Sequence, residues 1–107
     1  MESLTALGDP TRQRILKLLA RGGMNSGDIA RRLPISAPAV SQHLKTLRAA
    51  KLVRVQVRAQ QRFYELDQTG LLEVAAWIAR LTQFWNARLA ALEAELTKPI
   101  LKKEKKR

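Results

Sequence analysis

Two short helical segments joined by only four residues limit the fold of this chain more than any other feature of its sequence. The link is Leu-Pro-Ile-Ser, at residues 33–36. Pro34 ends the first segment, because proline lacks the backbone N–H that a helix interior needs, and Ser26 is expected to cap its start. Ser36 is expected to cap the second segment, which runs to about residue 50. A link this short is typical of a helix-turn-helix.

Two further helices are predicted, one before this pair and one near the C-terminal end. In the earlier helix, Asp9 suits the N-cap and Pro10 suits the first helical position. Asp67 is expected to cap the later helix, which covers residues 68–97. Apolar residues recur in it every three or four positions: Leu71, Val74, Ile78, Leu81, Trp85, Leu89, Leu92 and Leu96. Such a stripe packs along another helix.

The apolar pattern changes between these helices, in residues 52–66. Apolar and polar residues alternate in 52–58 and again in 62–66, and Ala59, Gln60 and Gln61 lie between the two runs. Two alternating runs with a short connection predict a β-hairpin. A hairpin directly after a helix-turn-helix makes a winged helix-turn-helix. The expected fold is therefore mostly α, with a small β-hairpin wing and a long C-terminal helix.

Positive charge is concentrated in the middle of the chain. The net charge is +11, from 20 basic and 9 acidic residues, and no acid occurs between Asp28 and Glu65. A block of one sign inside a folded domain indicates a polyanionic partner. The basic tail at residues 98–107 is weaker evidence, because basic termini are often simply disordered. We expect one domain at residues 1–97 and a disordered tail after it.

The second helix of the pair carries residue types that read DNA. At about 100° per residue, Val40, Leu44 and Leu47 share one face, which we expect to be buried. The opposite face collects Pro38, Gln42, Lys45 and Ala49, flanked by Ser41 and Thr46. Glutamine pairs with adenine, serine and threonine bind bases or phosphates, and lysine binds guanine or phosphate. His43 lies at the edge of the buried face, where packing or a phosphate contact is favoured over a pH switch.

The wing carries the other candidate DNA contacts: Arg54, Arg58, Gln60, Gln61 and Arg62. Such a hairpin reaches along the DNA backbone or into the minor groove, whose negative potential favours arginine. The alternative is a solvated hairpin with no ligand.

The composition excludes several kinds of chemistry. There is no cysteine, so disulfides and thiolate metal sites are excluded, and the one histidine cannot form a metal site alone. No pair of carboxylates lies on a pocket-forming element, so we expect no enzyme and no cofactor. The N-terminal segment does not resemble a signal peptide, and no apolar run is long enough to cross a bilayer. We therefore expect a cytoplasmic protein without membrane contacts.

Three stretches together resemble one family of regulators. They read ALGDPTRQRILKLL, DIARRLPISAPAVSQHLKTLRAAKLV and RFYELD, and the likeness covers about residues 4–77. This set of motifs resembles the ArsR family of winged-helix transcriptional repressors. The extended last helix and the missing cysteines are similar to autorepressor-type members rather than to metal sensors.

The resemblance implies a homodimer on double-stranded DNA. The first and last helices would pair across a two-fold axis, and two recognition helices would enter successive major grooves of a palindromic operator. The implied recognition positions are Ser36, Ala37, Pro38, Ser41, Gln42, His43 and Lys45, with Arg58, Gln60, Gln61 and Arg62 on the wing. The expected dimer interface comprises Leu4, Leu7, Leu71, Val74, Ile78, Leu81, Trp85, Leu89 and Leu92.

Three departures from the family pattern matter. Residues 26–33 lack the family's thiolate metal motif and the long helix lacks histidine, so no metal is expected. Lys51 stands where the family often has glycine, and would be mildly strained if that position needs a positive φ. The wing tip also lacks the usual glycine, which leaves its turn type open.

Two classes of function remain after these exclusions. The first is a sequence-specific DNA-binding regulator, most consistent with a dimeric repressor. The second is a winged-helix module that binds an acidic protein partner, against which the small and polar face of the helix at 36–50 argues. The alternative to the dimer is that the long helix folds back on its own domain. Trp77 is the residue of this helix that could pack there.

Overall fold

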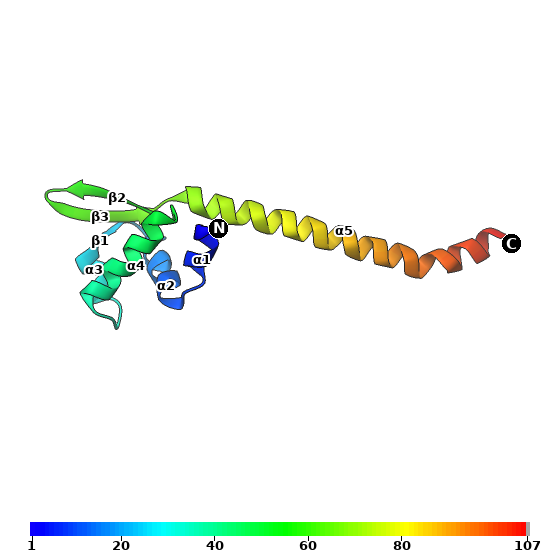
Figure 1. The fold of residues 1–107 in the computed structure, drawn as a ribbon, viewed down its shortest axis with the longest axis horizontal. Helices are drawn as coiled ribbons and strands as arrows, with labels where there is room; N and C mark the ends of the chain where they lie inside the picture. Colours follow the sequence, from blue (N-terminus) through cyan, green and yellow to red (C-terminus); the bar gives the residue numbers. More distant parts are fainter. Residues whose placement is uncertain (107) are drawn as a thin grey trace. The chain divides into compact units, whose positions relative to one another are not determined.

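The computed structural model has two helices on either side of the link at residues 33–36, as the sequence predicts. Helix α3 (Ser26–Arg31) comes before the link and helix α4 (Ala37–Ala49) comes after it (Figure 1). The Ser36 hydroxyl caps α4 by accepting a hydrogen bond from the Ala39 N–H at 3.2 Å. Because both ends of the link are fixed by helix termini, the two helices pack against each other.

The structure describes the backbone of residues 1–106 and the side chains of residues 1–97. Two units can be distinguished, Met1–Val74 and Ala75–Arg107, and each is described by itself. The predicted disordered tail at 98–107 lies outside the residues whose side chains are described, and it stays a prediction. No helix in the described part is long and apolar enough to cross a membrane.

Besides α3 and α4, the elements in chain order are α1 (Glu2–Leu7), α2 (Pro10–Leu19), β1 (Met24–Asn25), β2 (Val53–Arg58), β3 (Gln61–Leu66) and α5 (Gln68–Lys106). Two of them, helix α1 and strand β1, were not predicted from the sequence. Neither produces a readable apolar period, because α1 has six residues and β1 has two. The predicted mostly helical winged architecture is otherwise confirmed.

The capping predictions are right for α2 and α5 and wrong for α3. Asp9 Oδ1 accepts hydrogen bonds from the N–H groups of Thr11 and Arg12, at 2.8 and 3.1 Å. At α3 the cap is Asn25 rather than Ser26, because the Asn25 side chain accepts the Asp28 N–H at 2.8 Å. Ser26 is already the first helical residue.

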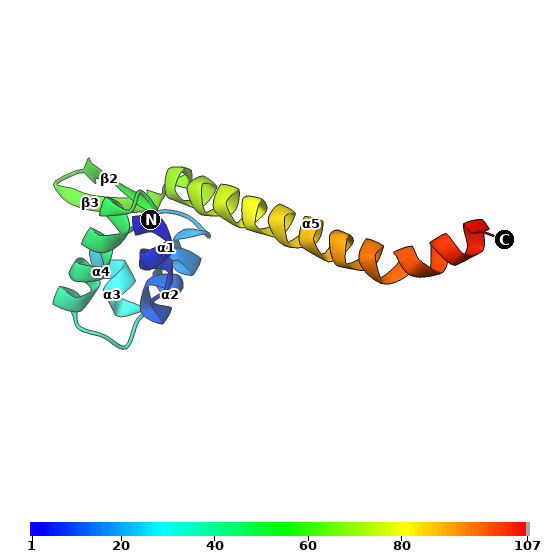
Figure 2. The same cartoon turned by 45° about the vertical axis from the view of Figure 1, so that its right-hand side comes forward.

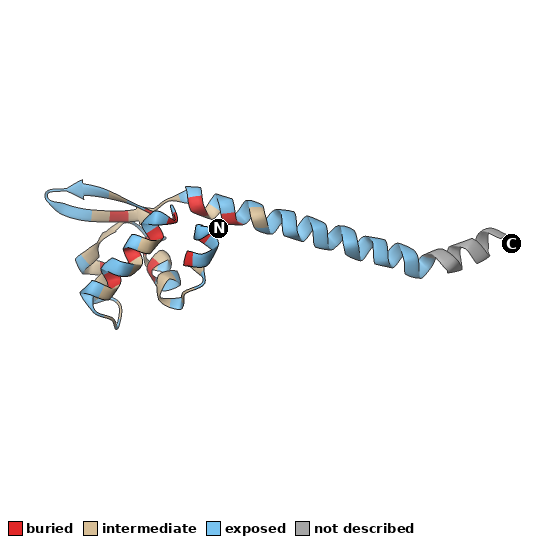
Figure 3. Ribbon diagram, in the orientation of Figure 1, coloured by how far each residue is buried: buried red, intermediate tan, exposed pale blue. Residues whose placement is uncertain are grey.

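Helix α4 is the centre of the core of this unit. Val40, Leu44 and Leu47 are buried, as predicted, and pack with Ile15 and Leu19 of α2. Helices α1, α2 and α3 all contact α4, and all four lie on one side of the sheet (Figure 2). The buried positions gather on the inward faces of these helices (Figure 3). Burial of one face of α4 therefore fixes which residues of α4 face outward.

The sheet is antiparallel, with strand order β1-β3-β2. Arg58 pairs with Gln61, so the loop of the wing contains only Ala59 and Gln60 rather than the three residues predicted. Both loop residues have positive φ, 48° and 67°. Two consecutive positive φ values match a type I′ turn, whose twist fits that of the flanking strands. Tyr64 is buried under the wing while Phe63 is half-buried.

The start of α5 is fixed against the end of α4. The Gly70 N–H donates to the Lys51 carbonyl at 2.8 Å, and Asp67 Oδ1 accepts the Thr69 N–H at 2.9 Å. A Cβ on Gly70 would lie 2.6 Å from the Ala50 oxygen, so glycine permits this close approach. Val74 is buried and Leu71 is half-buried within this unit, and the dimer interface predicted for these two residues stays a prediction.

The second unit is the continuation of α5. Its apolar stripe is exposed in the single chain, with exposed fractions of 49% for Ile78, 58% for Trp85 and 49% for Leu92.

Replacing Lys51 by Gly is expected to stabilise the protein. Lys51 has a φ of 59°, which lies in the left-handed region. The mild strain expected for a lysine at a position that needs a positive φ is therefore present. Lys51→Gly should raise the free energy of unfolding by about 0.5–1 kcal/mol, because relief of the side-chain clash exceeds the extra freedom of the unfolded chain. Urea unfolding followed by circular dichroism measures this change.

The matched control is Lys17→Gly, in helix α2. Its backbone is already helical, so the same substitution should lower the free energy of unfolding by about 1 kcal/mol. Equal losses in both variants would contradict the argument.

Candidate nucleic-acid interface

The outer face of α4 presents the residues predicted to read DNA. Ala37, Pro38, Ser41, Gln42 and Lys45 are exposed, because the opposite face of the helix is buried. No acidic residue occurs on α4, so no carboxylate repels phosphate from this face. We call these five residues the reading face.

A groove of about 530 Å³ lies between α4 and the wing. It brings Arg62 of β3 together with Gln42 and Lys45 of the reading face. The rest of its lining consists of Ser26, Ser41, Leu44, Arg48 and Tyr64, so it holds three basic side chains and no acid. Arg62 has no hydrogen-bond or ion-pair partner among the described residues. This groove is a positively charged channel with hydroxyl and amide donors along it.

Apart from the buried Leu44 and Tyr64, two lining residues of this groove were not predicted as site residues. Arg48 follows Lys45 by three positions, and the helical period could have identified it. Ser26 comes from the start of α3, and nothing in the sequence relates it to the wing. It also lines a second cavity of about 400 Å³ with Gln60, Gln61 and Arg62. Arg62 therefore connects the wing tip to the reading face.

The wing arginines differ in their partners. Arg54 lies opposite Glu65 in the strand register, and its Nε donates to Glu65 Oε1 at 2.8 Å. The charge of Arg54 is thus paired within the hairpin, and its predicted contact with DNA stays a prediction. The guanidinium of Arg58 lies 4.3 Å from the centroid of the Phe63 ring and donates to Gln56 Oε1 at 3.1 Å. Arg58 is oriented by this stacking and forms no ion pair with a described residue.

His43 is held by α2 rather than by the reading face. Arg12 Nη1 lies 3.4 Å from His43 Nδ1, and arginine can only donate, so Nδ1 is the acceptor. Arg12 Nε also donates to the Ala6 carbonyl at 2.7 Å. The backbone hydrogen bond from Arg12 is the main cause that lowers the pKa of Asp9 below its usual value. One arginine therefore joins α1, the cap of α2, and α4.

Thr46 departs from the predicted site. Its hydroxyl donates to the Gln42 carbonyl at 3.2 Å, and it lines a separate cavity against α1. Within the described residues, no three His, Cys, Asp or Glu side chains come together as metal ligands. The structure thus brings Ser41, Gln42 and Lys45 of the reading face together with Arg62 in one basic groove. The other predicted DNA contacts do not line that groove: Ser36, Ala37, Pro38, His43, Thr46, Arg54, Arg58, Gln60 and Gln61.

The chain is similar to known proteins that contain a helix-turn-helix domain. A family model described as a helix-turn-helix domain matches residues 7–56. The chain is 48% identical over 84 residues to the HTH-type transcriptional regulator Rv2034 of Mycobacterium tuberculosis, covering 78% of this chain and 76% of the relative. It is 40% identical over 73 residues to the transcriptional repressor SdpR of Bacillus subtilis, covering 68% of this chain and 81% of that one.

A solved structure is similar over most of its length. The ArsR-like transcriptional regulator from Rhodococcus sp. RHA1 superposes with a TM-score of 0.76 at 33% sequence identity. The match covers 85% of this chain and 86% of that protein.

The contact between Arg12 and His43 predicts the tautomer of the histidine. Because Nδ1 accepts from arginine, neutral His43 should carry its proton on Nε2. Long-range ¹H–¹⁵N spectra at pH 8 distinguish the two tautomers. Arg12→Lys should remove this preference and lower the free energy of unfolding by about 1 kcal/mol, because lysine cannot replace all these hydrogen bonds.

Arg14→Lys is the matched control, since Arg14 is exposed on the same helix. It should change neither the histidine spectrum nor the stability. A proton found on Nδ1 of neutral His43 in the unmodified protein would refute the assignment.

Proposed function

Because the chain belongs to the ArsR family of winged helix-turn-helix transcriptional regulators, it is a DNA-binding regulator of transcription and not an enzyme, and we propose that it is a dimeric repressor of a palindromic operator. The observation that carries this proposal is the acid-free groove that joins the reading face to Arg62. A surface of one charge with amide and hydroxyl donors fits DNA better than it fits an acidic protein. Its expected location in the cytoplasm stays a prediction.

In the proposed complex, α4 lies in the major groove. Gln42 can pair with adenine through both atoms of its amide, and Lys45 can contact guanine or phosphate. The small side chains of Ala37 and Pro38 allow the start of α4 to approach the base edges closely. The wing follows the DNA backbone, where Arg62 and Arg58 contact phosphates or enter the minor groove. Arg54 contributes less, because Glu65 balances its charge.

The proposed dimer rests on the exposed stripe of α5. Ile78, Leu81, Trp85, Leu89, Leu92 and Leu96 are each at least 42% exposed in the single chain. Isolated apolar residues are common on surfaces, but a continuous stripe of this length marks an interface. A dimer would also present two reading faces, as a palindromic operator requires.

The charges along α5 favour an antiparallel pair of helices. Reversing the chain about residue 87 places Ile78 opposite Leu96 and Trp85 opposite Leu89. The same reversal places Arg80 beside Glu93 and Glu95 of the second copy. A parallel pair would instead place like charges together, which is destabilising. The charges therefore favour the antiparallel orientation, in which Leu81 and Leu92 lie opposite Glu93 and Thr82.

Repression, rather than activation, is the proposed outcome of binding. The relative SdpR is named as a transcriptional repressor. The chain itself has a DNA-reading unit and a helix suited to pairing, and such a dimer can block access to the DNA that it covers.

Substitutions at Gln42 and Arg62 should separate base reading from phosphate contact. Gln42→Ala should reduce discrimination between operator and scrambled duplex by about 1–3 kcal/mol, because one base contact is lost. Arg62→Ala should weaken binding to both duplexes alike and lower the salt slope, log Kd against log salt, by about 0.9. Fluorescence anisotropy across a range of salt measures both effects, after footprinting of the chain's own upstream region identifies an operator.

The control for both variants is Arg21→Ala, at an exposed position that lines a different cavity. It should leave discrimination and salt slope nearly unchanged. If Gln42→Ala also keeps full discrimination, the module that binds an acidic protein becomes the better hypothesis.

Single cysteines should reveal the orientation of the dimer, because the chain has none of its own. In an antiparallel pair, residues 78 of the two copies lie about 27 Å apart, from a rise of 1.5 Å per residue. Ile78→Cys should therefore not crosslink with itself, whereas a mixture of Ile78→Cys and Leu96→Cys should form a disulfide-linked dimer. Non-reducing gel electrophoresis after mild oxidation reports the products.

Sedimentation velocity provides the control for assembly. Trp85→Asp should produce monomers and Gln83→Glu, off the stripe, should not. An unmodified chain that is monomeric at micromolar concentration would refute the dimer, and efficient self-crosslinking of Ile78→Cys would refute the antiparallel orientation.

A further inference from the structure

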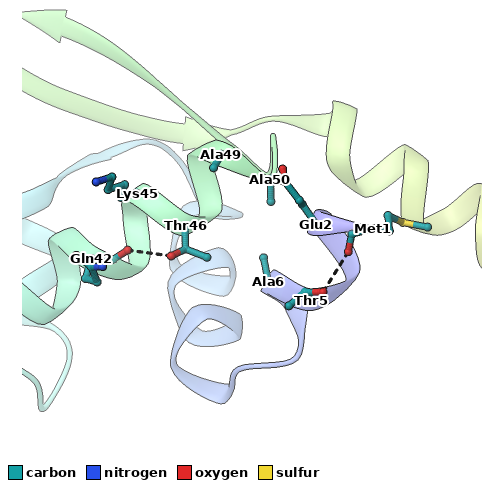
Figure 4. A pocket seen from close by; sticks show the side chains of 9 residues that line it. All are labelled: Met1, Glu2, Thr5, Ala6, Gln42, Lys45, Thr46, Ala49 and Ala50. Carbon is teal, nitrogen blue, oxygen red and sulfur yellow. Dashed lines mark hydrogen bonds between the residues drawn. The ribbon is translucent and has the colours of Figure 1, made fainter.

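Two cavities outside the proposed DNA interface differ in the charges of the residues that line them. The cavity between α1 and α4 is lined by the carboxylate of Glu2 and also by the ammonium group of Lys45 (Figure 4), so its charges are mixed. A second cavity, of about 270 Å³, lies beside α2. Its lining consists of Arg14, Lys17, Leu18, Arg21 and Leu33. We call it the α2 cavity, and all of its charged residues are basic.

The three basic side chains of the α2 cavity are not neutralised within the fold. Arg14, Lys17 and Arg21 are exposed, and none of them forms an ion pair with a described residue. Helix α2 contains no acidic residue. The acids before and after it are used elsewhere, because Asp9 caps α2 and Asp28 forms an ion pair within α3. An anionic partner would therefore supply a charge that the described part of the chain does not.

Two leucines form the apolar part of the α2 cavity. Leu33 is half-buried and packs against the hydrophobic core, so it belongs to the fold. Leu18 is also half-buried, but it is neither in the core cluster nor in the layer that packs against it. Leu18 thus keeps apolar surface at the cavity, and an inserted apolar group would remove that surface from water.

The size and shape of the α2 cavity favour a protein segment as the occupant. Its volume lies below the range of about 300–1,000 Å³ that is typical of drug-sized ligands, but it suffices for one inserted side chain. Binding to an anionic membrane uses apolar side chains that project from the surface, whereas Leu18 and Leu33 are half-buried between exposed basic side chains. A basic rim around a recessed apolar floor fits an apolar anchor flanked by carboxylates.

The α2 cavity faces away from α4. Ile15 and Leu19 are buried in the core, on the side of α2 that packs with α4. At about 100° per residue, Arg14, Lys17 and Arg21 lie about 120–180° around the helix from that side. No residue of the reading face or of the expected dimer interface lines this cavity. A partner bound here would therefore leave the reading face free.

We propose that the α2 cavity binds an acidic protein segment, which inserts one large apolar side chain against Leu18 and Leu33 and pairs its carboxylates with Arg14, Lys17 and Arg21. The binding itself does not depend on the proposed function. That the regulator holds this partner while bound to DNA does rest on the proposed function. This partner also differs from the acidic partner considered above for α4, because it occupies another surface.

The test uses the synthetic peptide Glu-Asp-Ser-Phe-Ser-Glu-Asp as the probe. In ¹H–¹⁵N spectra of the full chain, the peptide should shift the amide signals of Lys17, Leu18, Arg21 and Leu33. The same peptide with alanine in place of phenylalanine should bind about tenfold more weakly, because the apolar anchor is lost. Leu18→Gln should weaken binding of the first peptide but not of the alanine peptide. Circular dichroism should show an unchanged fold for this variant, because Leu18 lies outside the core.

Charge reversal tests the basic rim. Arg14→Glu should weaken binding of the phenylalanine peptide about fivefold, because it replaces an attraction by a repulsion. The matched control is Arg88→Glu, at an exposed position of α5, which should bind the peptide as the unmodified chain does.

A peptide that leaves the signals of Lys17, Leu18, Arg21 and Leu33 unchanged, for example by binding only in the groove beside α4, would overturn the proposal. Equal binding of the two peptides would do the same, as would an Arg14→Glu variant with unchanged affinity. Vesicles of phosphatidylglycerol that shift these signals when the peptide does not would identify a membrane site instead.

A final measurement separates this proposal from the proposed function. With an operator duplex bound, the peptide should still shift the signals of the α2 cavity, and displacement of the peptide by the duplex would overturn the separate location of the two sites. A chain that binds the peptide at α2 yet binds no duplex would contradict the proposed function and leave the α2 cavity standing as a protein-binding site.

Discussion

The burial of one face of α4 is the constraint on which the rest of this structure depends. Val40, Leu44 and Leu47 are almost completely inaccessible, and helices α1, α2 and α3 all pack against α4. Because side chains on a helix point in fixed directions, this burial determines which residues face outward. Gln42 and Lys45 are presented to a ligand by the packing of the core, without any loop to position them. Truncation of a buried leucine here would therefore disturb stability and recognition together.

The distribution of charge over the surface of residues 1–74 depends on where the few acidic residues lie. In residues 1–74, Asp9 and Asp67 cap helices, while Asp28 and Glu65 neutralise Arg31 and Arg54. Caps and local ion pairs use these carboxylates in forming the fold itself. The positive charge of Lys45, Arg48 and Arg62 is left without such compensation in the groove beside the wing. The acids that cap helices and form local ion pairs thus lie outside the groove that we propose binds DNA.

Much of the fold and of the candidate DNA interface can be predicted from the sequence. Physical reasons also explain which elements and contacts could not be predicted. The buried seam of α4 was predictable because its apolar period extends over two turns, and Asp9 was predictable because the cap and Pro10 reinforce each other. Strand β1 was not predictable, because a strand of two residues cannot show an alternation of apolar and polar residues. The pairing of Arg54 with Glu65 depends on strand register, which a hairpin with an unknown turn does not fix. The contact of Arg12 with His43 joins residues 31 positions apart, and no local pattern encodes it.

Backbone strain in this unit is concentrated around the wing. Lys51, Ala59 and Gln60 are non-glycine residues with positive φ, and they lie immediately before the hairpin and at its tip. Glycine would adopt these conformations more easily, but it would also make the hairpin more flexible. Side chains with a Cβ restrict the turn to fewer conformations, so the direction of the hairpin is better defined. Since Arg58 and Arg62 lie on either side of the tip, a rigid turn fixes their positions relative to α4. The register then places Arg58 and Arg62 on opposite faces of the hairpin, and it is Arg62 that lines the groove beside α4.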